Sequence, residues 1–157
     1  MTPRALWRWT LVRQPAALRT CFCKMALRMC IPSTLGVMDV SFISITKILP
    51  AAAKIMGEDG AFISLIKPQF EAGRDRVGKK GVVRDAQVHR DVICEVLGFI
   101  ENDLGWAVQA LSFSPIRGPE GNIEFLVHIL PKAKATHHVT QEEIDEVVAA
   151  AHDSLRD

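Results

Sequence analysis

The sequence predicts one α/β domain whose sheet mixes parallel and antiparallel strands. Four short apolar runs have the length of strands: residues 35–40, 61–66, 106–113 and 123–130. Apolar residues at three- and four-residue spacing predict helices between the first three runs. The chain has 157 residues, 48% of them apolar, which is enough for one core but not for two domains of ordinary size.

The first two predicted strands belong to a strand–helix–strand unit. Residues 35–40 are a short apolar run, and residues 44–56 have helical spacing, with a proline that bends or shortens the helix. Residues 61–66 are the clearest buried strand, and Lys67 and Pro68 end it. A helix between two strands of one sheet predicts that the strands are parallel and the crossover right-handed.

A loop and a long helix come next. The loop runs from Gln69 to Arg84 and is rich in glycine and basic residues. Asp85 is a good N-cap for a helix that reaches about Leu104, where Gly105 ends it. The spacing of the apolar residues indicates that one face of this helix packs on the sheet.

The last two strands and a final helix complete the predicted fold. The connection between strands 106–113 and 123–130 is too short for a crossover, so these strands are expected to run antiparallel. Thr140 and Glu143 have the spacing of a capping box, which predicts a helix that extends to about Leu155.

Three ionisable residues stand where predicted strands meet loops. Asp39 and Lys67 lie at the carboxyl ends of two parallel strands, and Glu124 lies at the start of an antiparallel strand. The three positions therefore face one edge of the sheet, where sites form in open α/β folds. A buried lysine between two carboxylates can handle protons, so this edge is the candidate active site.

Each of these residues also has a structural interpretation, and the sequence alone leaves both open. Asp39 could cap the next helix, a task that Ser41 or Ser44 could share. Lys67 could be a solvated strand end. A salt bridge between Lys67 and Glu124 would account for both residues without catalysis.

The loop after Lys67 carries a local cluster of basic residues. The net charge of the whole chain is +1, which gives no electrostatic case for nucleic acid. The loop itself would suit the phosphates of an RNA strand, and a solvated loop with chance charges is the alternative. The predicted RNA-binding residues are Arg74, Arg76, Lys79, Lys80 and Arg84.

Residues 1–34 differ from the rest of the chain. They contain three of the four cysteines and no sustained period, so we expect this segment to be disordered or out of frame. No histidine pair at finger spacing follows Cys21 and Cys23, and no metal site is expected. No run approaches the roughly 20 apolar residues that span a bilayer, so we expect a cytoplasmic protein without membrane contact.

The ordered runs that contain the candidate site resemble a known family. They are Asp39-Val40-Ser41-Phe42-Ile43-Ser44, Lys67-Pro68-Gln69-Phe70-Glu71-Ala72-Gly73, Gly81-Val82-Val83-Arg84-Asp85, Ser114-Pro115-Ile116, Gly118-Pro119-Glu120-Gly121-Asn122 and Glu124-Phe125. Over residues 37–130 the chain is similar to the haemolysin A (TlyA) branch of the FtsJ-like ribosomal RNA methyltransferases. The resemblance implies a partial Rossmann-like methyltransferase sheet, made of the later parallel strands and an antiparallel last strand, with flanking helices.

The resemblance also implies an activity. Enzymes of this type transfer a methyl group from S-adenosylmethionine to a ribose 2′-hydroxyl of ribosomal RNA, with a Lys-Asp-Lys-Glu tetrad. By motif, Asp39, Lys67 and Glu124 match the aspartate, the central lysine and the glutamate. A lysine with a lowered pKa can accept the hydroxyl proton or orient the oxygen. The implied partner is ribosomal RNA or a ribosomal subunit.

The chain departs from the family pattern before residue 35. The tetrad's first lysine, the glycine-rich turn that cradles the cofactor and a small RNA-binding domain are not recognisable, so we expect impaired S-adenosylmethionine binding. The codons of residues 9–12 can spell Val-Asp-Val-Gly in a shifted frame, a run typical of the family. This indicates that residues 1–34 are an out-of-frame translation.

Two functions remain in view. The first is an impaired fragment of a ribosomal RNA ribose 2′-O-methyltransferase, with a truncated catalytic domain at residues 35–131 and a carboxyl-terminal helix within residues 132–157. The second is a non-catalytic RNA-binding or interaction remnant that uses the basic loop and the last helix. A half sheet would expose a strand edge, so self-association through that edge is expected.

Overall fold

A five-stranded sheet in the order β1-β2-β3-β5-β4 is the frame of the computed structural model, which describes residues 26–29 and 35–155. Its strands are β1 (Ala26–Met29), β2 (Leu35–Asp39), β3 (Ala61–Ile66), β4 (Trp106–Phe113) and β5 (Phe125–Pro131). Strands β2 and β3 are parallel, and β5 is antiparallel to both β3 and β4. The predicted mixed sheet of an α/β fold is therefore confirmed.

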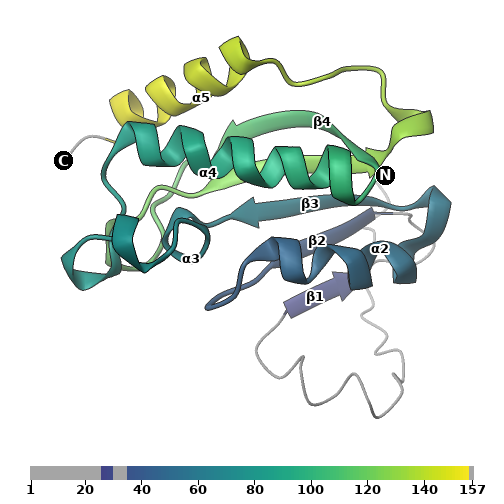
Figure 1. Ribbon diagram of the computed structural model, residues 1–157, viewed down its shortest axis with the longest axis horizontal. Helices are drawn as coiled ribbons and strands as arrows, with labels where there is room; N and C mark the ends of the chain where they lie inside the picture. The colour runs from purple at the N-terminus through teal and green to yellow at the C-terminus, as the bar shows by residue number, and fades with distance from the viewer. Residues whose placement is uncertain (1–25, 30–34, 156–157) are drawn as a thin grey trace, which may run out of the picture.

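Helices α2 and α4 cover one face of this sheet, and α5 lies beside α4 (Figure 1). The α-helices are α2 (Leu49–Met56), α3 (Pro68–Glu71), α4 (Ala86–Gly98), which continues as the π-helical turn η5 (Phe99–Asp103), and α5 (Gln141–Ser154). The 3-10 turns are η1 (Ile45–Lys47), η2 (Gly57–Asp59), η3 (Arg74–Arg76), η4 (Lys79–Gly81), η6 (Pro119–Gly121) and η7 (Lys132–Lys134). As predicted, Asp85 caps α4, and Gly105 follows η5 with a left-handed φ of 73°.

The helix predicted over residues 44–56 is split near its start. Ser44 caps η1, because its hydroxyl accepts a hydrogen bond from the Thr46 N–H at 3.2 Å. Helix α2 begins only at Leu49, so Pro50 falls in its first turn, where the missing proline N–H removes no helical hydrogen bond. Pro50 therefore shortens the helix, as expected.

The prediction of a continuous loop from Gln69 to Arg84 is wrong at its start. Helix α3 begins at Pro68, directly after the extended residue Lys67. The fixed φ of proline suits the first position of a helix, so the residue that ends strand β3 also starts a helical turn. The turns η3 and η4 follow. Residues 69–84, called the basic segment below, are therefore built largely of short turns.

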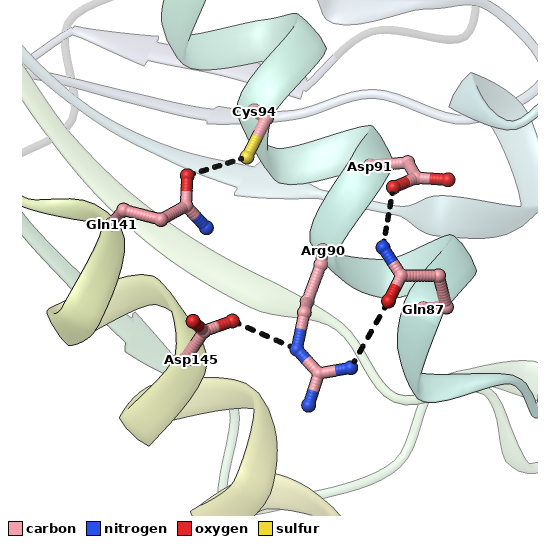
Figure 2. Close-up of a pocket in the computed structure, with 6 residues that line it drawn as sticks. All are labelled: Gln87, Arg90, Asp91, Cys94, Gln141 and Asp145. Atoms are coloured by element: carbon pink, nitrogen blue, oxygen red, sulfur yellow. Dashed lines mark hydrogen bonds and ion pairs between the residues drawn. The ribbon is translucent and has the colours of Figure 1, made fainter.

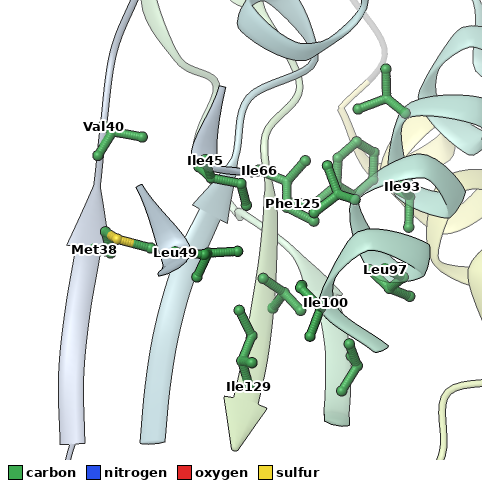
Figure 3. Close-up of a cluster of buried hydrophobic side chains, with 14 of the residues drawn as sticks. Met38, Val40, Ile45, Leu49, Ile66, Ile93, Leu97, Ile100, Phe125 and Ile129 are labelled. Carbon is green, nitrogen blue, oxygen red and sulfur yellow. The ribbon is translucent and has the colours of Figure 1, made fainter. Parts of the chain in front are cut away.

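The hydrophobic core lies between the sheet and the helices on its covered face (Figure 3). Along β2 and β3, exposed or partly buried residues alternate with buried ones, as strands with one covered face require. Met38, Ile66 and Phe125 are fully buried, and Ile66 pairs with Phe125 in the sheet register. The chain positions of Lys67 and Glu124, next to these two residues, therefore rest on rigid packing.

The sheet edge beside β2 is occupied by β1, which pairs antiparallel with it. Residues 26–29 thus form a strand within the segment predicted to be disordered or out of frame. The rest of that segment, Cys21 and Cys23 included, lies outside the described residues, and its origin stays a prediction. Self-association through a sheet edge also stays a prediction, with β1 instead of β2 as the edge strand. In the described ranges, no helix combines the length and apolar character needed to cross a bilayer.

Helix α5 is held by its cap and by a pair of histidines. The predicted capping box is present: Thr140 Oγ1 accepts from the Glu143 N–H, and Glu143 accepts from the Thr140 N–H at 2.8 Å. Nδ1 of His89 on α4 lies 2.9 Å from Nε2 of His152 on α5. His89 is fully buried against Phe125, and this burial, followed by the charge of His152, lowers the pKa of His89 to about 4.

The depressed pKa of His89 predicts that acid destabilises the fold. Between about pH 4 and the ordinary value of 6.5, the unfolded chain binds more protons than the folded chain. The free energy of unfolding should therefore be retained above pH 6.5 and fall as the pH approaches 4, by up to about 3 kcal/mol. Urea unfolding across this range measures the loss.

The matched variants separate His89 from the other titrating groups. The His89→Gln variant should lose part of the acid-dependent decrease, whereas His138→Gln, at an exposed position, should keep it. An identical decrease in wild type and His89→Gln would contradict this assignment.

Candidate active site

Lys67 is the centre of a cluster at the carboxyl ends of β2 and β3. Its Nζ atom lies 2.5 Å from Asp39 Oδ1 and 3.9 Å from Glu124 Oε1. It also donates a hydrogen bond to the Ser41 hydroxyl at 3.3 Å. The structure therefore brings the three predicted catalytic residues together, at the edge that the strand directions indicated. Their catalytic role stays a prediction.

The burial and contacts of this cluster argue against two of the structural interpretations, a solvated strand end for Lys67 and a helix cap for Asp39. Lys67 is only 7% exposed, so it is not a solvated strand end. Ser44 caps the next helical turn, so the Asp39 carboxylate is left to contact Lys67. Burying an ammonium group is costly unless opposite charges and hydrogen bonds compensate it. The two carboxylates and the Ser41 hydroxyl supply that compensation.

Glu124 is fixed by two features that the sequence analysis did not single out. Gln69 Nε2 donates a hydrogen bond to Glu124 Oε1 at 3.1 Å. Gly118 lies so close that a Cβ atom there would clash with the same carboxylate. Glu124 is 6% exposed, and its position depends on the absence of a side chain at residue 118. The Lys-Pro-Gln run at the strand end was a signal that could have pointed to Gln69.

The side chain of Gln69 also carries a buried acceptor. Its Oε1 atom is buried and has no hydrogen-bond partner within the described residues. The amide orientation follows from its neighbour, because only the NH₂ group can donate to the Glu124 carboxylate. A buried acceptor without a donor costs free energy.

The loop between β2 and η1 exposes an aromatic ring beside the cluster. Phe42 is 81% exposed and has a φ of 66°, which is unusual for a residue with a side chain. Its ring centroid lies 5.0 Å from that of Phe70 in α3. The Glu71 carboxylate accepts from the Ile45 N–H at 2.8 Å and ties this loop to α3, while burial raises the pKa of Glu71. Phe42 lies three residues after Asp39, but its exposure and its backbone conformation could not be predicted from the sequence.

The basic residues of the predicted RNA-binding set divide into two groups. Arg76 turns toward α4: Nη2 lies 3.0 Å from Glu95 Oε1, and Nε donates to the Ala72 carbonyl at 2.7 Å. Its charge thus serves the fold locally. The remaining four are exposed on or next to the turns η3 and η4: Arg74, Lys79, Lys80 and Arg84. RNA binding by this set stays a prediction.

Asn122 joins the basic segment to the loop that carries Glu124. Its Oδ1 accepts from the Val83 N–H, and its Nδ2 donates to the Gly81 carbonyl, each at 3.0 Å. Its own carbonyl accepts from the Gly118 N–H at 2.9 Å. Asn122 is 3% exposed, so these bonds form in a dry environment and are hard to replace with water.

The described turns after β2 and β3 do not form a cradle for the nucleoside part of a nucleotide-like cofactor. Such a cofactor needs a glycine-rich turn after a parallel strand, where the backbone can approach it closely. Residues 40–44 follow β2 and residues 67–68 follow β3, and neither turn contains a glycine. In the part of the chain that the structure describes, the edge beyond β2 and β3 thus supplies acidic, basic and amide groups without such a cradle.

Other hollows lie away from Lys67. Between α4 and α5, polar side chains satisfy one another across an open groove (Figure 2). There, Arg90 lies 2.8 Å from Asp145, and Cys94 donates to Gln141 at 3.4 Å. A larger cavity of about 990 Å³ lies where β4 begins and β5 ends, beside Trp106. Neither hollow includes a residue of the Lys67 cluster.

The parallel pair β2–β3 with its helical crossover and the antiparallel β5 make this a partial Rossmann-like sheet, and the Lys67 cluster lies at the strand ends. The chain belongs to the FtsJ-like methyltransferase family, whose model matches residues 17–130. The predicted resemblance, including its haemolysin A branch, is confirmed by the relatives.

Two curated relatives and one solved structure illustrate the likeness. "Putative rRNA methyltransferase YqxC" of Bacillus subtilis is 45% identical over 76% of this chain and 43% of its own length. The "16S/23S rRNA (cytidine-2'-O)-methyltransferase TlyA" of Mycobacterium tuberculosis is 39% identical over 59% of this chain and 34% of its own length. A structure titled "Putative hemolysin from Streptococcus thermophilus" has a TM-score of 0.70 and 43% identity, over 78% of this chain and 44% of the other. The chain therefore spans less than half the length of these relatives.

The close approach of Gly118 to Glu124 predicts that an alanine at position 118 destabilises the fold. The Gly118→Ala substitution should destabilise the fold by about 1–3 kcal/mol, because the Glu124 carboxylate must leave its place beside Gln69. The same substitution at Gly98 in α4 meets no atom closer than 3.9 Å and should stabilise the helix by about 0.5–1 kcal/mol. Urea unfolding of both variants tests the contrast, and equal effects would rule out the steric role of residue 118.

Proposed function

We propose that residues 35–131 form the acceptor side of the active site of an S-adenosylmethionine-dependent ribosomal RNA ribose 2′-O-methyltransferase. The observation that carries the proposal is the buried Lys67 ammonium, in contact with Asp39 and close to Glu124. The Mycobacterium tuberculosis relative is named as a cytidine-2′-O-methyltransferase, and this is the reaction to which the arrangement is fitted.

In this proposal Lys67 holds the attacking oxygen. A ribose hydroxyl is a poor nucleophile until its oxygen is oriented and its proton removed. Lys67 can donate to that oxygen while Asp39 and Glu124 keep the ammonium in place. The Asp39 carboxylate, whose side chain is 52% exposed, can take up the hydroxyl proton as the oxygen attacks. Fixing the oxygen in this way reduces the entropy cost of reaching the transition state.

The remainder of the proposed reaction depends on groups beyond the described residues. S-adenosylmethionine supplies an electrophilic methyl group when it is bound. Because the described turns after β2 and β3 lack a glycine-rich cradle, we propose that the chain alone binds this cofactor poorly and is impaired as an enzyme. Its contribution is then acceptor recognition and orientation.

Two surface features support RNA as the acceptor. The exposed Phe42 ring stands beside the lysine cluster and can stack on an unpaired base. The turns that carry Lys79 and Lys80 are exposed and can contact backbone phosphates. The proposed partner is ribosomal RNA or a ribosomal subunit, which places the protein in the cytoplasm.

A chimera tests the acceptor site without depending on cofactor binding by this chain. Residues 35–131 replace the matching segment of the Mycobacterium tuberculosis relative, and methyl transfer to ribosomal RNA is measured. We expect activity, and we expect Lys67→Ala in the chimera to lower the rate by about 100-fold or more, because the attacking oxygen loses its donor. Lys47→Ala, at an exposed position outside the cluster, should leave the rate unchanged.

Cofactor affinity of the chimera, measured by calorimetry, shows that the fold is intact. Lys67→Ala should leave this affinity nearly unchanged. A folded chimera that binds S-adenosylmethionine but transfers no methyl group would contradict the proposal, as would a Lys67→Ala chimera with full activity.

The second candidate, a non-catalytic RNA-binding remnant, is supported by the exposed basic residues of the turns η3 and η4, which need no cofactor to bind RNA. It shares one prediction with the first. The intact chain should bind a ribosomal RNA fragment, and the double change Lys79→Ala/Lys80→Ala should reduce the slope of log K against log salt by about 1–2.

The change Lys132→Ala/Lys134→Ala removes the same charge near the other end of the sheet and serves as the matched control. Equal losses in both double variants would contradict a role for the turn η4.

A further inference from the structure

A small cleft lies between the end of the basic segment, the loop before β5 and the end of α5. Its volume is about 160 Å³. It is lined by Val83, Arg84, Arg117, Gly121, Ile123, His152 and Leu155. Neither Lys67 nor Glu124 lines it, so it is a separate hollow, although one of its walls belongs to the loop that leads to Glu124.

Two walls of this cleft are joined by Asn122. Its buried side chain accepts from the Val83 N–H on one wall, and its carbonyl accepts from the Gly118 N–H within the other. Residues 118–121 form a turn that is closed by a hydrogen bond from the Gly121 N–H to the Gly118 carbonyl at 3.1 Å. The spacing of the two walls is therefore set by buried hydrogen bonds, which makes the cleft preorganised.

The third wall is held in a similar way. His152 lines the cleft, and its Nε2 lies 2.9 Å from Nδ1 of the buried His89. His89 packs edge-on against Phe125 in the core. The His152 ring is thus held on its core side by His89, because His89 cannot move without disturbing the packing around Phe125.

The chemistry of the lining points to an oxyanion. Arg84 and Arg117 come from two different loops, and each carries five N–H donors in a planar fork that matches phosphate. Arg84, Arg117 and His152 also make contacts within the protein. A guanidinium has donors enough to keep such a contact and bind an anion as well.

We propose that this cleft is a subsite for one phosphate group of an RNA backbone, held by the Arg84 and Arg117 guanidiniums against the His152 wall. The assignment of RNA as the source of the phosphate rests on the proposed function. A phosphate held here is tied through Asn122 to both the basic segment and the Glu124 loop, so it fixes the register of the strand relative to the lysine cluster.

The first test uses inorganic phosphate and the intact chain. Phosphate titrated into the protein should cause saturable NMR shifts of the His152 ring and the Arg117 side chain. The variants Arg84→Ala and Arg117→Ala should each weaken this binding at least about 10-fold, since each removes a charge-assisted contact. Lys132→Ala, outside the cleft, should leave it unchanged. Shifts that do not saturate, or that persist in the Arg84→Ala/Arg117→Ala variant, overturn the subsite.

The second test identifies the source of the phosphate. In ribosomal RNA binding, Arg117→Ala should reduce the salt slope by about 1, and Arg117→Lys should restore most of the slope but less of the affinity. Unchanged RNA binding in Arg117→Ala overturns the RNA subsite while leaving the proposed acceptor site standing. Saturable phosphate binding by a chain that binds no RNA overturns the RNA assignment and the proposed acceptor as well, and leaves a site for free phosphate.

Discussion

A buried lysine held between two strand-end carboxylates is the interaction on which the rest of this edge depends. A charged lysine that is only 7% exposed persists only if opposite charges and hydrogen bonds replace the water around its ammonium group. Asp39 and Ser41 supply direct contacts, and Glu124 supplies a second negative charge at 3.9 Å. Removing the charge of buried Lys67 or Glu124 costs about 3–5 kcal/mol, whereas Asp39, whose side chain is 52% exposed, contributes less. The same compensation holds the lysine at the point where, in the proposed reaction, it meets the substrate oxygen.

The sheet makes that arrangement inevitable once the strand directions are set. Parallel strands β2 and β3 end at the same edge, and β5 begins there because it runs the other way. The paired and buried residues Ile66 and Phe125 anchor the neighbouring positions of Lys67 and Glu124. Above this core, Asn122 links the loop before β5 to the basic segment. The proposed acceptor site and the proposed phosphate subsite are therefore joined by the same strand ends and loops.

Much of the sheet and its long helices could be predicted from the sequence, because the spacing of apolar residues differs between strands and helices. The ends of β2 and β3 could be read from apolar runs, and convergence at the edge followed from topology. The hydrogen bonds of Gln69 and Asn122 could not, since each joins residues about 40 to 55 positions apart through loop conformations that no local pattern encodes. Strand β1 could not be predicted from the sequence for a different reason. It has no period of its own and exists by pairing with β2. The early start of α3 shows that a proline which ends a strand can also begin a helix.

A double-mutant cycle on Lys67 and Glu124 tests the central claim most directly. The variants Lys67→Met, Glu124→Gln and their combination are compared with wild type by urea unfolding of the intact chain at neutral pH. If the buried ammonium and carboxylate depend on each other, the double variant should be less destabilised than the sum of the single variants, by about 1–3 kcal/mol. Effects that add to within about 0.5 kcal/mol would contradict the account, because independent residues cannot form one charge-compensated site.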